Sequence, residues 1–200
     1  MEFACQQQSD LINWISRRMR AHGKQIDRNT ADYLIFMSGG LMTKLITEID
    51  KIASYSKGSA ILKSDIDAVV EPTVDAVAYK LTDALTEKKF DRAIEILNDL
   101  FAMREAPHKI IYGISLRFRQ MYSAFLCQQK NAPTSELMEM FDIRNEYQVR
   151  GIVQGARRCG GTWCKECMAL CAETAKKLNY SPLDGEELLL ELILAIAALE

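Results

Sequence analysis

Apolar side chains recur three and four residues apart in segment after segment of this 200-residue sequence, most clearly at Leu41, Leu45, Ile49, Ile52 and Ala53. This spacing places side chains on one face of an α-helix. Ten glycines and four prolines supply little turn punctuation, and the aromatic residues that strands favour make up only 8%. No segment alternates convincingly between apolar and polar residues. The sequence therefore predicts an all-α fold.

Helix ends are marked by familiar signals. Asp27 and Ser64 are expected to cap helices, Gly23 and Gly58 to end them, and Pro107 to open one. A last helix is expected from about 184 to 199, after one in residues 146–159 and a cysteine-bearing helix from Trp163. The predicted buried stripes are Leu11, Trp14, Ile15 and Met19; Ala31, Leu34, Ile35 and Met37; Val77, Leu81, Ala84 and Leu85; Phe90, Ile94, Leu97 and Phe101; and Ile110, Ile114, Phe118, Met121 and Phe125.

A change of helix length suggests two domains. Short helices with glycine-bearing turns precede Pro72, and longer helices follow Thr73. We expect a first helical module in residues 1–72 and a second in residues 73–200.

Four of the six cysteines, Cys159, Cys164, Cys167 and Cys171, fall within thirteen residues. The spacing superficially resembles zinc and iron–sulfur motifs. If Trp163–Leu178 is helical, however, Cys164 and Cys171 are about 10 Å apart along its axis, which is too far for thiolates that share one ion. We expect these cysteines to pack as small apolar side chains, with no metal and no cofactor.

Other site chemistry has little support in the sequence. It contains no G-x-x-x-x-G-K-[ST] phosphate loop, and neither His22 nor His108 accompanies a recognisable nucleophile, so no catalytic residue is assigned. Two basic clusters, Arg17–Lys24 and Arg157–Arg158, have the charge to meet phosphates. A solvated helix face is the simpler explanation for them, because the net charge is −2.

The sequence shows no recognisable signal for membrane insertion or secretion. No apolar run reaches the roughly 18 residues that a membrane span needs, since Leu188–Leu199 is short and contains Glu191. No secretory signal is visible, and the cysteine spacing is not that of a secreted disulfide scaffold. A cytoplasmic protein without membrane contact is expected.

The order of motifs resembles the bacterial DNA polymerase III delta subunit, the clamp-loader wrench. The resemblance runs through "LINWI", "GKQID", "YLIFMSGGLMTKLITEIDKIASY" and "ILKSDIDAVVEP". The second half, from "AVAYKLTDAL" to "AKKLNYSPLDGEELLLELILAI", is similar to that family's collar. The matching residues are Trp14, Ile15, Gly23, Lys24, Ile26, Gly39, Leu45, Glu48, Ile49, Lys51, Ile52 and Tyr55.

The resemblance implies an AAA+ lid-like module at 1–72 and an oligomerising collar at 73–200. It implies a non-enzymatic subunit whose collar joins the ATPase motor subunits and a delta-prime-like subunit. The family's N-terminal AAA+-like module, which grips the sliding clamp, is not in this sequence, so a C-terminal piece of the subunit is expected.

Two alternatives come from other classes. A helical DNA-binding regulator that dimerises through its long C-terminal helices needs a basic recognition helix, and the helix after Asp27 is apolar. A helical metal or redox protein rests on the cysteines alone.

Overall fold

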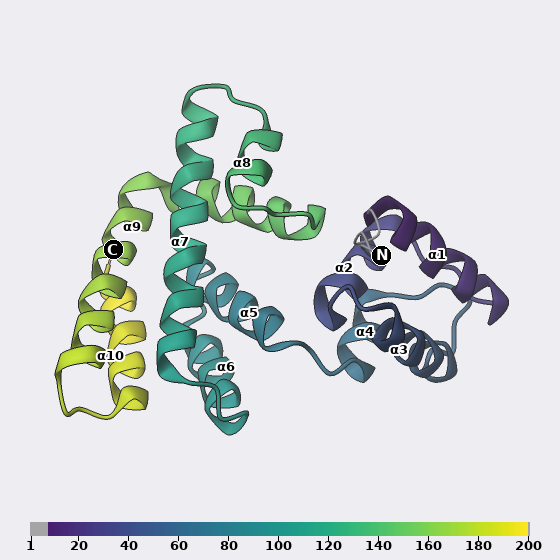
Figure 1. The fold of residues 1–200 in the computed structure, drawn as a ribbon, viewed down its shortest axis with the longest axis horizontal. Coiled ribbons are helices and arrows are strands. Elements are labelled where there is room, and N and C mark those ends of the chain that lie inside the picture. Colours follow the sequence, from purple (N-terminus) through teal and green to yellow (C-terminus); the bar gives the residue numbers. More distant parts are fainter. Residues whose placement is uncertain (1–7, 200) are drawn as a thin grey trace, which may run out of the picture. The chain divides into compact units, whose positions relative to one another are not determined.

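All regular structure is helical in the computed structural model, which describes residues 8–199 (Figure 1). The extended backbone pairs only in a bridge between Gln25 and Ala60 within these residues. The all-α prediction is thus confirmed. The helices are α1 (Gln8–Ala21), α2 (Arg28–Ser38), α3 (Met42–Tyr55), α4 (Lys63–Val69), α5 (Val74–Thr86), α6 (Phe90–Ala102), α7 (Pro107–Gln129), α8 (Thr134–Met140), α9 (Glu146–Tyr180) and α10 (Gly185–Ala197).

The chain forms two compact units. Unit 1 contains the described residues up to Thr73 together with Arg144–Gln148. Unit 2 contains Val74–Ile143 and the described residues from Val149 onward. Fully buried apolar side chains occur in both units, so each has a core of its own.

Unit 1 packs α1 to α4 around branched aliphatic side chains. The α3 stripe is buried as predicted at Leu45, Ile49, Ile52 and Ala53, but Leu41 is exposed because α3 begins after it. Further core residues are Leu11, Ile15, Met19, Ala31, Leu34, Ile35, Met37, Ile61 and Ile66.

The two predicted caps of unit 1 have different outcomes. Asp27 caps α2, since its carboxylate accepts the backbone N–H groups of Asn29 and Thr30, and a hydrogen bond from the Thr30 hydroxyl lowers its pKa. The prediction that Ser64 caps α4 is wrong. That helix already begins at Lys63, and the Asp65 carboxylate reaches back to accept the Leu62 N–H.

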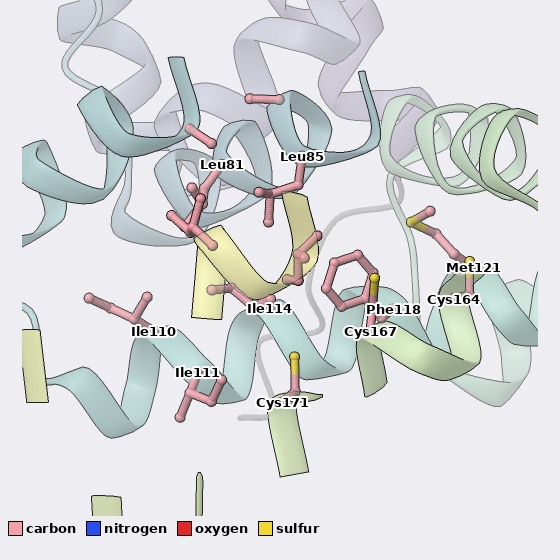
Figure 2. Packing of buried hydrophobic residues seen from close by; sticks show 14 of the residues in the cluster. Leu81, Leu85, Ile110, Ile111, Ile114, Phe118, Met121, Cys164, Cys167 and Cys171 are labelled. Carbon is pink, nitrogen blue, oxygen red and sulfur yellow. The ribbon is translucent and has the colours of Figure 1, made fainter. Parts of the chain in front are cut away.

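Unit 2 is built around α7. Ile110, Ile114, Phe118 and Met121 lie on one stripe of α7 and are buried as predicted. Figure 2 shows them beside Leu81 and Leu85 of α5 and three cysteines of α9. The predicted α5 stripe is also fully buried, at Val77, Leu81, Ala84 and Leu85.

The predicted orientation of α6 is wrong by part of a turn. Phe90, Ile94 and Phe101 are only half-buried, and the buried side chains beside Leu97 are Ala93, Ile96 and Leu100. Helix α6 contacts both α5 and α10, so its buried face is centred between the two. Apolar residues on both flanks of the stripe made its centre ambiguous in the sequence.

Helix α9 is two helices joined at a break. Gly160 has φ 76° and ψ 169°, a conformation that essentially only glycine adopts. The break separates a first half, Glu146–Cys159, from a second half that carries Cys164, Cys167 and Cys171, as the sequence predicts. Figure 1 shows the ribbon of α9 changing direction along its course.

Glycines allow α9 to approach its neighbours closely. A Cβ on Gly151 would lie 1.8 Å from the Tyr79 hydroxyl oxygen, and a Cβ on Gly161 would lie 2.4 Å from the Phe125 ring. A Cβ on Gly155 would lie 3.0 Å from the Met121 methyl group. Side chains of α5 and α7 therefore fill the space that a larger residue of α9 would need.

Two glycine-to-alanine substitutions separate this packing effect from helix propensity. Gly151→Ala is expected to lower the free energy of unfolding by about 1–3 kcal/mol, because the new methyl overlaps Tyr79. Gly113→Ala on α7 is the control, since its Cβ would meet only Ala78 at an ordinary 3.7 Å. It is expected to stabilise by about 0.5–1 kcal/mol.

Urea unfolding followed by circular dichroism measures both changes. In the Gly151→Ala background, Tyr79→Phe removes the overlapping hydroxyl and should recover part of the loss. Equal effects of alanine at 113 and 151 would contradict the close approach of α9 to α5.

Candidate interaction surfaces

The cysteine cluster is part of the core of unit 2. Cys164, Cys167 and Cys171 are 0%, 0% and 1% exposed. Figure 2 places their sulfur atoms near Phe118 and the aliphatic residues of α7. Burial raises the pKa of Cys164 to about 12 and that of Cys171 to about 12, and it raises the pKa of Cys167 as well. The prediction that they pack as apolar side chains is confirmed.

The fourth cysteine of the cluster is separate. Cys159 is half-buried and its thiol donates to the Thr86 carbonyl oxygen at 3.5 Å. It lines a hollow with Lys88, Arg158 and Trp163. Among the residues that the structure describes, no three or more His, Cys, Asp and Glu side chains are grouped to hold a metal ion.

Most of the first basic cluster serves the fold. Arg18 and His22 both contact the Asp50 carboxylate, at 3.4 Å and 3.0 Å. The Lys24 ammonium donates to the carbonyl oxygens of Ser56 and Gly58 at 2.6 Å and 2.7 Å, just beyond the end of α3, where a cation offsets the helix dipole. The remaining members, Arg17 and Arg20, are exposed.

The second basic cluster divides between two surroundings. Arg158 contacts the Glu87 carboxylate at 3.4 Å, and hydrogen bonds from Lys89 and Arg158 lower the pKa of Glu87. Arg157 is exposed and lines a different hollow with Thr134, Arg150 and Gln154.

Both histidines contact polar side chains of a neighbouring segment. His22 contacts Asp50, and the His108 ring nitrogen lies 3.3 Å from the Asn179 amide oxygen. Both histidines are in exposed contacts between neighbouring helices.

The burial of one arginine of α7 was not predicted from the sequence. Arg117 is 4% exposed, stacks 3.8 Å over the Tyr79 ring and donates to the Asp83 carboxylate at 3.1 Å. Burial raises the pKa of Asp83, although the Arg117 charge opposes the shift. Arg117 lies three residues after Ile114 and four before Met121, so helical spacing alone assigns it to the buried face.

Several residues of the delta-subunit motif have structural roles. Gly23 and Gly39 have φ of 71° and 80°, which favours glycine. Glu48 is buried in α3 and pairs with Lys51 at 2.7 Å. These residues of the motif therefore stabilise the turns and helices of unit 1.

Large apolar side chains also remain on the surface of unit 2. They include Tyr112 on α7, Met140 on α8, Tyr180 at the end of α9 and Leu194 on α10. In the described part of the chain, no helix combines the length and the apolar character that a membrane crossing requires.

Thiol reactivity tests the burial of the cysteines. A Cys5→Ser background is used, because Cys5 lies outside the described residues. With Ellman's reagent at pH 8, we expect Cys127 and Cys159, both half-exposed, to react first. Cys164, Cys167 and Cys171 should react only when the chain unfolds, since burial keeps these thiols protonated and inaccessible.

The same thiols predict a pH dependence of stability. Their pKa values are about 9 when unfolded and are raised in the folded state, so the folded protein binds more protons above pH 9. Their contribution to stability is complete below pH 9 and should fall between pH 9 and 12.

Five rapidly reacting thiols in the folded Cys5→Ser protein would contradict the buried placement, and stoichiometric zinc or iron by elemental analysis would favour a metal site instead.

The comparison with solved structures extends across both units. The structure is similar to that of the Bacillus subtilis DNA clamp loader delta protein (YqeN), with a TM-score of 0.73 and 16% sequence identity. The match covers 96% of this chain and 57% of that protein, so this chain spans little more than half of its length. At this identity the likeness establishes a shared fold.

The sequence comparisons concern unit 2. No curated protein matches the sequence. The family model described as DNA polymerase III delta subunit, C-terminal domain, matches residues 75–196, which is more than half of the chain. This chain therefore belongs to the family formed by the C-terminal domains of DNA polymerase III delta subunits.

Proposed function

We propose that this chain is the lid and collar part of a clamp-loader delta subunit, and that unit 2 joins it to the other loader subunits. The observation that carries the proposal is the family match to residues 75–196. These limits nearly coincide with unit 2, which begins at Val74. A compact helical unit with its own core is suited to anchoring a subunit.

Residues 1–72, which make up most of unit 1, are proposed to be the AAA+ lid-like module, and residues 73–200 the collar. Thr73 and Arg144–Gln148 belong to unit 1 but fall within the proposed collar in sequence. Support comes from the motif around Gly23, Lys24, Glu48 and Lys51, and from the structural likeness, which covers 96% of the chain. In a complete subunit this module would connect the collar to an N-terminal module that grips the clamp.

The docking surface proposed for the collar includes the exposed stripe of α10. Leu194 is 61% exposed. One turn to either side of it, Leu190 is partly buried and Ala198 is exposed. Transfer of such apolar surface from water into an interface contributes about 25 cal/mol per Å². The occupants proposed are the ATPase motor subunits and a delta-prime-like subunit.

The proposed role is mechanical. ATP hydrolysis belongs to the motor subunits, and this chain contributes binding surfaces without catalytic residues or a cofactor of its own. A location in the cytoplasm follows from a role in DNA replication.

Substitution on α10 tests the docking surface. Leu194→Asp should weaken assembly with the motor subunits of a matching clamp loader by at least tenfold, because it puts a charge into an apolar contact. Met140→Asp on α8 is the matched control, since Met140 is also 61% exposed. Figure 1 shows α8 and α10 at different ends of α7, so the control leaves the α10 stripe unchanged.

Size-exclusion chromatography of the 200-residue chain with the motor subunits measures the assembly. The unchanged chain is expected to co-elute with them and not to bind the sliding clamp alone. Independent elution from every motor subunit would refute the proposal, and a stable homodimer that binds DNA would favour the helical regulator instead.

A further inference from the structure

We propose that the first half of α9 carries a binding site for the phosphate backbone of nucleic acid, centred on Arg150, Gln154 and Arg157. These side chains line a hollow of about 200 Å³ together with Thr134, which begins α8. The site is separate from the α10 stripe proposed for docking. It is tested on the 200-residue chain alone, so its failure would leave the proposed function intact.

The local charge of α9 favours an anionic ligand. From Val149 to Lys165 the chain contains four basic residues, Arg150, Arg157, Arg158 and Lys165, and no acidic residue. All four side chains are exposed. This stretch lies between Glu146 and Glu166 of the same helix, and its positive charge contrasts with the net charge of −2 for the whole chain.

The two adjacent arginines of α9 differ in their pairing. Arg158 is bound to the Glu87 carboxylate at 3.4 Å. Arg157 has no acidic partner among the residues that the structure describes, and it forms part of the wall of the hollow. The guanidinium of Arg157 is therefore available to a ligand in a way that its neighbour is not.

The side chains of the hollow match phosphate oxygens in chemistry and spacing. Arg150, Gln154 and Arg157 lie four and three residues apart, so they form one stripe on the helix. Together with Thr134 they present guanidinium, amide and hydroxyl donors, and no carboxylate lines the hollow. Seven residues of helix separate the arginines by about 10 Å, a span over which a nucleic-acid strand presents several phosphates.

An acidic protein segment is a less suitable occupant. Protein interfaces are anchored by large apolar or aromatic side chains at their centre. The apolar lining here consists of Val149, which is buried, and Val153, which is partly buried. A phosphate backbone needs no such anchor, because charge and hydrogen bonds supply its affinity.

The absence of an aromatic residue from the lining also indicates the mode of binding. Bases of single strands bind by stacking on aromatic rings. This hollow offers donors to the backbone alone, so binding should be independent of sequence. Duplex DNA, which has the higher charge density, should bind at least as tightly as single-stranded DNA.

Fluorescence anisotropy of labelled duplex and single-stranded DNA, over a salt series, tests the site. Arg157→Ala should weaken duplex binding about threefold to tenfold and reduce the slope of log K against log salt by about 0.9, the loss of one phosphate contact. Arg119→Ala is the control, since Arg119 is exposed on α7 and does not line the hollow. It carries the same change of charge and should have a smaller effect.

A second pair of variants keeps the result independent of folding defects. Gln154→Glu introduces a nearly isosteric carboxylate between the two arginines of the hollow, where it competes with phosphate, and should weaken duplex binding more than tenfold. Gln129→Glu, at the exposed end of α7, makes the same chemical change outside the hollow and should leave most of the binding. Circular dichroism is measured for every variant.

Two results would overturn the proposal. The first is equal loss of DNA binding in each variant and its control, or no salt-dependent binding at all. The second is tight binding of a polyglutamate peptide, lost in Gln154→Glu, together with no binding of either DNA, which would assign the hollow to an acidic protein segment. Competition by inorganic phosphate alone, at concentrations that leave ionic strength unchanged, would support the site.

Discussion

The close approach of α9 to α5 and α7 is the constraint on which unit 2 depends. It requires glycine at positions 151 and 161, because Tyr79 and Phe125 occupy the space that a Cβ would need there. Once α9 is held there, its second half brings Cys164, Cys167 and Cys171 against Phe118 and Ile114. The small side chains of α9 thus leave the space that the large side chains of α7 fill.

A charged side chain, Arg117, is also buried in the core of unit 2. The Arg117 guanidinium lies over the Tyr79 ring and bonds to Asp83, so α5 and α7 are linked by a polar contact beside their apolar interface. The pair adds little net stability, because the buried Arg117 loses its hydration while the Asp83 side chain remains partly exposed to water. Its geometric demands do, however, favour one alignment of the two helices over others, and we interpret the pair in that way.

Helical periodicity predicted the fold class and the buried stripes of α2, α5 and most of α7. It did not predict that α2 is buried on all sides from Thr30 to Ser38, including the polar residues Asp32 and Ser38. It failed for α6, where Phe90, Ile94 and Phe101 widen the face on both sides. The cap at Ser64 was wrong because Asp65 provides the interaction from within the helix. Local signals of similar strength compete at such points, and tertiary packing decides between them.

The candidate surfaces were only partly predictable. Sequence identified both basic clusters, but not that Asp50 binds Arg18 and His22, or that carbonyl oxygens beyond the end of α3 bind Lys24. These partners lie about thirty positions away in the sequence, and only folding brings them together. The hollow beside Arg157 likewise needs Thr134 from another helix. The family resemblance, in contrast, could be predicted from local motifs, because a charge pair such as Glu48 and Lys51 joins residues only three positions apart.

The backbone at Gly160 has a consequence for chirality. Its φ of 76° and ψ of 169° are the mirror image of an extended conformation that L-residues adopt freely. Nothing lies within 4 Å of the position that an L-residue's Cβ would take, so the obstacle to an L-residue here is the backbone conformation and not a clash. A D-amino acid has that mirrored preference. D-Alanine introduced at this position by chemical synthesis should therefore match the backbone of the break in α9 and stiffen the unfolded chain, whereas L-alanine strains that backbone.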